Sequence, residues 1–206
     1  MPRYIGRENL RKRLEPNDGE PGRTTYEAGS VRIELPGETL TVRPAFGLVH
    51  EGSYESVVLG PLFEAVAEDH VVAALLVRLG GFAVGVLEGE RLVASKVGTR
   101  FVKGRHKKGG SSANRFRRRR EEQERALIEA AAQTAVDVLE PWRGRIEHAA
   151  LGGDRRAVAQ VTSDPRLAWL PERALPRFFT TGDPRQRDLE RLPYELYAAE
   201  TTEGAR

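Results

Sequence analysis

The sequence contains no cysteine, and this absence removes three kinds of chemistry. Without a thiol there can be no disulfide, no cysteine nucleophile and no cysteine-ligated zinc. The lack of cysteine also fits a reducing compartment, so we expect a cytoplasmic protein. The 206 residues are 39% hydrophobic, which is enough for a core in one large domain or in one domain plus an appendage.

Long apolar runs are missing as well. The longest, residues 71–87, is interrupted by Arg78 and by the pair Gly80-Gly81. It falls short of the roughly 20 residues that a membrane-spanning helix needs, so we interpret it as two buried strands. The first residues, Met1-Pro-Arg-Tyr-Ile, lack the apolar core of a signal peptide. We therefore expect no membrane partner.

Patterns that bind metals or nucleotides are also scarce. His50, His70, His106 and His148 show no close ligand spacing, and the strands expected over 71–79, 82–87 and 91–98 carry no carboxylate in their interiors. A metal-dependent nuclease on a ribonuclease-H-like sheet needs converging carboxylates, so this alternative is disfavoured. No Gly-Lys-Ser/Thr sequence is present to form a phosphate-binding loop. We expect neither a metal ion nor a cofactor.

Acidic residues are rare in one segment that is rich in basic ones. Residues 96–125 hold 12 Lys/Arg and 3 Glu, a net charge of +9, whereas the rest of the chain holds 21 Lys/Arg and 27 Asp/Glu, a net charge of −6. A local block of this size is typical of a surface that binds a polyanion. A solvated helix face is the alternative interpretation.

The pattern of polar and apolar residues predicts a mixed α/β sheet flanked by helices. We expect an N-terminal extension over residues 1–60, with a short helix over 7–14, a loose linker to about residue 30 and a β-hairpin around Pro36-Gly37. The main α/β domain is expected over 61–206. Its predicted elements are a helix over 61–69, strands over 71–79, 82–88 and 91–98, a long helix over 115–140, a strand over 145–151, a helix over 154–162, an edge strand at 178–180 and a final helix over 184–199.

The most informative segment is residues 105–120, Arg-His-Lys-Lys-Gly-Gly-Ser-Ser-Ala-Asn-Arg-Phe-Arg-Arg-Arg-Arg. A glycine pair frees the backbone from the conformational limits that a Cβ atom imposes, and the flanking cations can hold phosphates. The segment therefore predicts a loop tip, expected to be flexible without RNA, that brings its own main chain into a site made of nucleic acid.

The arginines lie at an unfavourable end of their expected helix. The amino end of a helix already carries partial positive charge, so each exposed cation there costs roughly 0.3–1 kcal/mol. Glutamates four residues later can pair with them, at Arg117–Glu121, Arg118–Glu122 and Arg120–Glu124, although Arg before Glu is the weaker order. A bound anion would remove the conflict. Ser112 or Asn114 is expected to cap the helix.

These residues resemble a known family. Residues 109–120 resemble the Gly-Gly-Gln-Ser-x-x-Arg-Phe-x-Arg-x-Arg segment of eukaryotic and archaeal class-one peptide-chain release factors. The likeness covers about residues 71–198 and is most specific over 82–139. Because 206 residues leave no room for that family's stop-codon-reading domain, the chain is more similar to the stand-alone Vms-like release factors (VLRF). The positions that match the segment are Gly109, Gly110, Ser112, Arg115, Phe116, Arg118 and Arg120.

The resemblance implies a peptidyl-tRNA hydrolase of ribosome quality control, which cleaves nascent chains from tRNA on stalled large ribosomal subunits. It implies that the loop acts through Gly109, Gly110, Ser111 and Ser112, with a main-chain N–H stabilising an oxyanion. Its partners would be the large subunit, ribosomal RNA and peptidyl-tRNA, with the protein a monomer away from the ribosome. The RNA-binding residues would be Arg105, His106, Lys107, Lys108, Arg115, Arg117, Arg118, Arg119 and Arg120.

The chain departs from the family at the motif glutamine. The release-factor glutamine maps to Ser111, and the glutamine of the Vms-like relatives maps to Ser112. A serine still supplies a main-chain N–H, so hydrolysis stays open. A binding module that occupies stalled subunits and has lost hydrolysis with the glutamine is the alternative. His106 is interpreted as an RNA contact rather than a base, because no acid is in place to orient it.

Overall fold

The computed structural model describes residues 3–99 and 111–204, which form two compact units. The first unit comprises residues 1–69 and 193–206, and the second comprises residues 70–192. The sequence predicts a domain boundary at residue 60, whereas the compact units divide at 69/70 and again at 192/193. Each unit has its own sheet and its own hydrophobic core.

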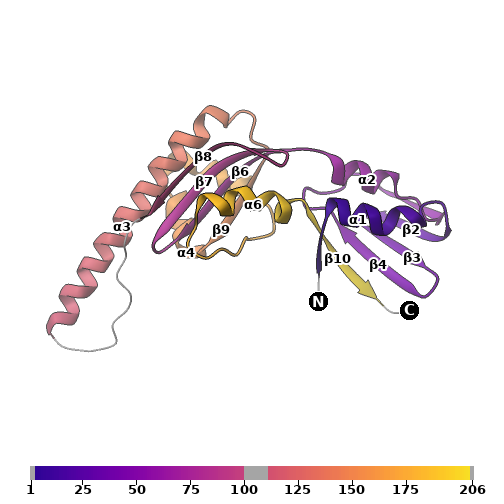
Figure 1. Cartoon of the computed structure of the whole chain (residues 1–206), viewed down its shortest axis with the longest axis horizontal. Coiled ribbons are helices and arrows are strands. Elements are labelled where there is room, and N and C mark those ends of the chain that lie inside the picture. The colour runs from indigo at the N-terminus through magenta and orange to yellow at the C-terminus, as the bar shows by residue number, and fades with distance from the viewer. Residues whose placement is uncertain (1–2, 100–110, 205–206) are drawn as a thin grey trace. The chain divides into compact units, whose positions relative to one another are not determined.

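The first unit is a six-stranded antiparallel sheet covered by two helices (Figure 1). Strands β3 (Ser30–Leu35) and β4 (Glu38–Arg43) form the predicted hairpin around Gly37. Val31, Ile33, Leu40 and Val42 alternate with exposed or half-buried residues and face the core. Leu10 and Leu14 of α1 (Arg7–Leu14) and Leu62 of α2 (Gly60–Ala67) complete that core. The sheet order is β1-β10-β4-β3-β2-β5, with β1 spanning Arg3–Gly6, β2 spanning Pro21–Glu27, β5 spanning Gly52–Ser56 and β10 spanning Ala198–Gly204.

Two predictions for this unit are wrong. The expected loose linker contains the short 3₁₀ turn η1 (Glu15–Asn17) and strand β2 (Pro21–Glu27), which buries Thr24 and Tyr26. The expected final helix ends early, and strand β10 (Ala198–Gly204) lies between β1 and β4. Both segments carry residues with weak strand preference, Pro-Gly in β2 and Ala-Ala in β10. Their strand structure therefore depends on pairing with neighbours distant in sequence.

The second unit is a four-stranded sheet in the order β8-β7-β6-β9. Strands β6 (Val71–Arg78), β7 (Gly81–Glu88) and β8 (Arg91–Thr99) form the predicted antiparallel meander. Strand β9 (His148–Gly153) pairs parallel to β6, after the chain has returned through helix α3 (Ser111–Leu139) and the 3₁₀ turn η2 (Glu140–Trp142). The mixed α/β fold with flanking helices is thus confirmed.

Helices cover both faces of this sheet. On one face Leu75 and Val84 pack with Leu127, Ala131 and other residues of α3, together with α4 (Arg155–Thr162). On the opposite face Leu189 of α6 (Gln186–Leu196) lies beside Gly85. Burial on two faces explains why β6 and β7 are nearly continuous apolar runs. Trp169, in the short helix α5 (Trp169–Glu172), is buried in the same core. The expected edge strand at 178–180 is reduced to a single bridge between Phe179 and Gly152.

Helix α3 is longer than the sheet that it crosses. Its 29 residues span about 43 Å at 1.5 Å per residue, whereas the eight residues of β6 span about 27 Å. Among its described side chains, Leu127 is the first to be buried, followed by Ala131, Ala135 and Leu139. The first part of α3, residues 111–126, consequently extends beyond the sheet, as Figure 1 shows. No helix among the described residues has the length and apolar character needed to cross a membrane.

Candidate nucleic-acid interface

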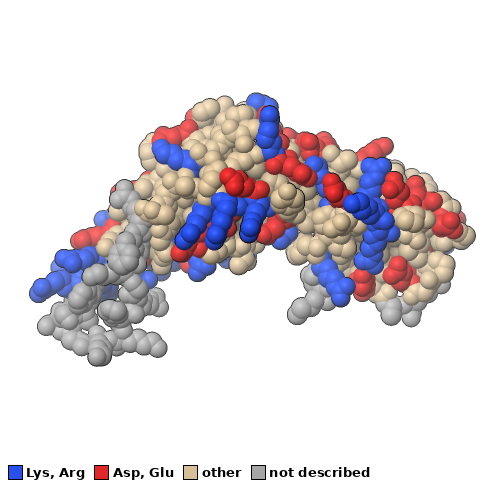
Figure 2. All heavy atoms as spheres, viewed as in Figure 1, with Lys and Arg blue, Asp and Glu red and all other residues tan. Residues whose placement is uncertain are grey.

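The extending part of α3 presents the arginine cluster to solvent. Arg115, Arg117, Arg118 and Arg119 are exposed, and Arg120 is half-buried. Figure 2 shows blue basic side chains gathered at this end of the helix, with red acidic ones following. Four adjacent cations lie on this helix end, three of them exposed, and form a surface suited to a polyanion. We call Arg115 and Arg117–Arg120 the arginine cluster.

Helix α3 begins at Ser111, four residues earlier than predicted from the sequence. Ser112 and Asn114 therefore lie within the helix instead of preceding and capping it. The main-chain N–H groups of residues 111–114 are the first four of the helix, and these have no partner within a helix. They add the positive end of the helix dipole to the charge of the arginine cluster, so both act on the same region.

Glutamates compensate little of this charge. Of the three predicted pairs, Arg117 and Glu121 are joined, with Arg117 Nε and Glu121 Oε1 3.8 Å apart and both side chains more than 60% exposed. Within the described part of the chain, Arg118 and Arg120 form no ion pair with Glu122 or Glu124. The Arg120 Nε atom is buried without a hydrogen-bond partner among the described residues. Exposed pairs of this kind contribute about 0.3–0.5 kcal/mol, so the cluster keeps most of its charge for an external partner.

Several predicted site residues lie outside the described residues, namely Arg105, His106, Lys107, Lys108, Gly109 and Gly110. The structure describes the residues on either side of these positions. Strand β8 ends at Thr99, which pairs with Gly81 beside the β6–β7 turn, and α3 begins at Ser111. The glycine pair therefore directly precedes the helix end that bears the arginine cluster.

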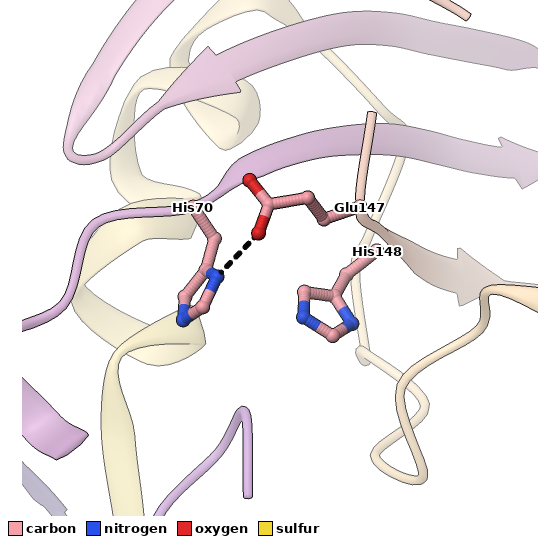
Figure 3. A group of neighbouring side chains, drawn as sticks. All are labelled: His70, Glu147 and His148. Carbon is pink, nitrogen blue, oxygen red and sulfur yellow. Dashed lines mark hydrogen bonds and ion pairs between the residues drawn. The ribbon is translucent and has the colours of Figure 1, made fainter. Parts of the chain in front are cut away.

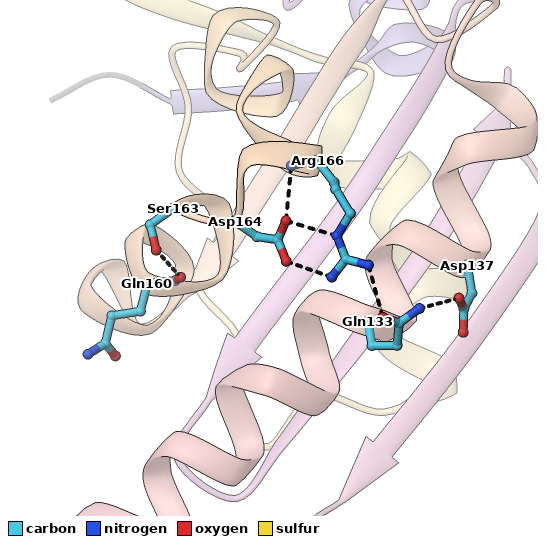
Figure 4. A network of polar contacts seen from close by, with 6 residues as sticks. All are labelled: Gln133, Asp137, Gln160, Ser163, Asp164 and Arg166. Atoms are coloured by element: carbon cyan, nitrogen blue, oxygen red, sulfur yellow. Dashed lines mark hydrogen bonds and ion pairs between the residues drawn. The ribbon is translucent and has the colours of Figure 1, made fainter.

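Polar contacts between α3 and the 3₁₀ turn η3 (Pro165–Leu167) hold the buried half of the helix (Figure 4). Asp164 accepts from Arg166 twice through the guanidinium, at 3.0 Å and 2.7 Å, and once through the main-chain N–H at 2.9 Å. Arg166 Nη1 donates to Gln133 of α3 at 3.0 Å, and Gln133 Nε2 donates to Asp137 at 2.7 Å. The hydrogen bonds from Arg166 lower the pKa of Asp164 to about 2. The carboxylate is thus ionised under all ordinary conditions.

A glycine pair at the end of β9 allows close packing against the end of β6. Gly153 has φ +97°, and a Cβ there would lie 2.1 Å from the carbonyl oxygen of Val77. A Cβ on Gly152 would lie 2.6 Å from the carbonyl oxygen of Phe179. Both positions therefore require glycine in this fold, because a Cβ would collide with a neighbouring main chain.

A second group of polar residues, which sequence reasoning missed, lies at the other end of the second unit. His70, Glu147 and His148 meet where β6 and β9 begin (Figure 3). His70 Nδ1 and Glu147 Oε2 are 2.9 Å apart. Separation by 77 residues hid this contact from any search for close ligand spacing. In the sequence, His70 directly precedes the strand predicted over 71–79, and His148 lies within the strand predicted over 145–151.

Comparisons with known proteins add the following findings. The family model of the Actinobacteria/Chloroflexi VLRF1 release factor (acVLRF1) matches residues 70–202. No curated protein matches the chain.

Among solved structures, the crystal structure of the archaeal translation termination factor aRF1 is similar, with a TM-score of 0.43 and 14% identity, over 80% of this chain and 51% of that one. A second similar structure, described as an archaeal protein, has a TM-score of 0.40 and 14% identity, over 77% of this chain and 48% of that one. The chain thus spans about half the length of these two proteins.

Proposed function

The chain belongs to the VLRF1 release-factor family of Actinobacteria and Chloroflexi, and we propose that it is a peptidyl-tRNA hydrolase. Membership of this family indicates a role in translation release or rescue. Its substrate would be the ester that joins a nascent chain to tRNA on a stalled large ribosomal subunit. The observation that carries the proposal is the joining of a Gly-Gly-Ser-Ser segment to an exposed arginine cluster at one end of α3.

The arginine cluster would supply binding. Arg115 and Arg117–Arg119 are exposed, so each can reach a phosphate of ribosomal RNA or tRNA. Neutralising phosphates releases condensed counterions, which makes the binding free energy favourable and dependent on salt. The length of α3 beyond the sheet would allow its tip to enter a narrow site while the body of the second unit stays outside it.

The main chain at the start of α3 would supply the chemistry. When water attacks the ester carbonyl, negative charge develops on the carbonyl oxygen and then on the 3′ oxygen of the departing tRNA. A positioned N–H donor can stabilise such charge by about 2.7–4 kcal/mol. The N–H of Ser111 is one of the helix N–H groups that lack an intrahelical partner. This donor does not require the glutamine side chain that class-one release factors carry at the position of Ser111.

The test separates the main chain from the side chain at residue 111. Ser111→Ala keeps the N–H and should retain most peptide release. Ser111→Pro removes it and should lower single-turnover release by at least about 100-fold. Proline is tolerated at the first position of a helix, and Ser111 is the first residue of α3, so the helix should persist. The measurement is peptide release from isolated large subunits carrying peptidyl-tRNA, at saturating protein.

Two controls accompany this test. Proline also restricts the preceding residue, so Gly110→Ala tests loop conformation separately. Subunit binding should survive in all three variants, because the arginine cluster is unchanged. Undiminished release by Ser111→Pro would reject the main-chain mechanism.

The replacement of the motif glutamine by serine favours one other function. A factor that occupies stalled subunits without cleaving the ester would keep the arginine cluster and dispense with the glutamine. Tight binding of the unmodified protein to stalled large subunits, with no peptide released, would assign this second function.

A further inference from the structure

The group formed by His70, Glu147 and His148 has no part in the proposed hydrolysis. It lies at the starts of β6 and β9, whereas the arginine cluster lies beyond their opposite ends. A strand of eight residues separates the two places by at least about 25 Å. At this distance the three side chains cannot contact a substrate bound at the arginine cluster, so we consider a different role for this group.

Parallel pairing of β6 and β9 brings the three residues together. His148 is the first residue of β9 and pairs with Val72, so His70 lies just before the paired region on the neighbouring strand. His70 is 8% exposed, His148 is half-buried, and the side chain of Glu147 is about half exposed. The rings of the two histidines meet edge to face with centroids 5.1 Å apart. Figure 3 shows both rings beside the carboxylate.

The ligand atoms lie at separations suited to one metal ion. One nitrogen from each histidine and one carboxylate oxygen all lie within 4.8 Å of one another. Two ligands bound at about 2.0–2.1 Å in a tetrahedral site are about 3.3 Å apart. The His70–Glu147 separation of 2.9 Å is close to this value. Small rotations of the half-exposed Glu147 and His148 side chains would complete the geometry.

The carboxylate is held by the backbone around it. Glu147 Oε1 accepts the N–H of Val71 at 3.0 Å, which leaves Oε2 directed at His70. The backbone N–H of Glu147 donates to the Val71 carbonyl at 2.8 Å, and that of Gly89 donates to the His70 carbonyl at 3.0 Å. Such outer contacts orient metal ligands and are the usual companions of a metal site.

The chemical types of the three ligands also suit a cation. Two imidazoles and one carboxylate suit Zn²⁺ and related transition ions, while Mg²⁺ and Ca²⁺ prefer oxygen ligands only.

We propose that His70, Glu147 and His148 bind one Zn²⁺ ion, with a fourth position open to water. Binding replaces the His70–Glu147 hydrogen bond by two metal–ligand bonds and ties the start of β6 to the start of β9. An ion that binds the folded chain and not the unfolded one stabilises the fold by mass action. The site would thus fasten the two central strands of the second unit at the end away from the arginine cluster.

The test uses the full-length protein treated with a chelator and then titrated with Zn²⁺ by calorimetry. We expect one ion per chain and a Tm that rises with the logarithm of free Zn²⁺. Co²⁺ in place of Zn²⁺ should give visible absorption bands that report nitrogen and oxygen ligands. Fe²⁺ and Mn²⁺ titrations compare the other ions that this ligand set accepts. Tighter binding of either would overturn the assignment to Zn²⁺.

Matched variants locate the ion. His148→Ala and Glu147→Gln should each weaken Zn²⁺ binding at least about tenfold, the lower range for disturbing a metal site. His50→Ala and His106→Ala remove the other two histidines and should leave the affinity unchanged. His148→Gln replaces His148→Ala if circular dichroism shows that the alanine variant is unfolded.

The outcomes are distinct from those of peptide release. Absence of saturable binding at micromolar Zn²⁺, or undiminished affinity in Glu147→Gln and His148→Ala, would overturn the proposal. Loss of binding in His106→Ala would overturn it as well, because the ion would then lie elsewhere.

Discussion

Gly153 occupies a backbone position that other residues adopt only with strain. Its φ of +97° lies in the left-handed region, and the carbonyl oxygen of Val77 fills the space where a Cβ would project. Gly153→Ala should therefore destabilise the second unit by about 1–3 kcal/mol. Chemical denaturation measures this. Gly144→Ala is the matched control, because nothing lies within 4 Å of its Cβ position. Equal stability of the two variants would show that the chain at Gly153 shifts without cost.

Asp164 makes stability depend on pH in an acidic window. Its pKa is lowered to about 2 in the folded protein, from an ordinary value of 3.8. A lowered pKa adds stability that is present above the ordinary value and is lost as pH falls through the folded value. Between about pH 4 and pH 2 the folded protein should lose less stability in Asp164→Asn than in the unmodified chain. Urea denaturation at several pH values measures the difference, and parallel curves would contradict it.

Among the helices, α3 should determine how RNA binding depends on salt, because it carries the arginine cluster. Replacing Arg117, Arg118 and Arg119 by Gln should reduce the slope of log K against log salt by about one unit for each phosphate that is no longer neutralised. Filter binding or fluorescence anisotropy with large subunits over a range of salt measures the slope. Circular dichroism should show the fold unchanged, because these side chains are exposed.

The matched control lies in the other unit. Arg11, Lys12 and Arg13 are also three consecutive exposed basic residues on a helix, and their replacement by Gln changes the net charge equally. This variant should keep the original slope. A change of the same size in both variants would show that net charge, and not the arginine cluster, governs the salt dependence.

Elements with strong local patterns were predictable from the sequence, and those that depend on distant partners were not. Helix α1, the β3–β4 hairpin and the meander of β6, β7 and β8 follow from periodicity and turn residues that lie within each segment. Strand β10 follows the end of α6 and contains two alanines, so its residues favour a helix locally. Pairing with β1 and β4 outweighs that preference.

The candidate sites differ in the same way. The arginine cluster is a run of adjacent residues, so its charge is visible in the sequence before its position is known. The start of α3 differs from the predicted one by four residues because Ser112 and Asn114 are better known as caps than as helix interior. The group of His70, Glu147 and His148 arises only when β9 pairs with β6, and pairing of distant strands leaves no mark in either segment alone.

Across the molecule as a whole, the two units should respond differently to loss of β10. Strand β10 lies between β1 and β4, and its Ala199 and Thr201 are buried in the first unit. A chain truncated after Tyr197 should lose amide protection in β2, β3 and β4, while β6, β7 and β9 keep theirs because their core is separate. Hydrogen exchange measures both. Truncation after Gly204 is the control, and intact protection of β4 in the shorter chain would contradict the prediction.

The pairing of β10 with β1 also sets the order in which the protein itself can fold during synthesis. Thr201 bonds to the carbonyl of Arg3, 198 positions earlier, and all of residues 70–192 lie between the two parts of the first unit. At 5–20 residues per second, roughly 7–27 s pass between the translation of residue 69 and that of residue 204. During that time the second unit can complete its core, while the sheet of the first unit still lacks β10, the strand that joins β1 to β4. A protein of a release-factor family is thus itself a nascent chain whose amino-terminal unit is finished last.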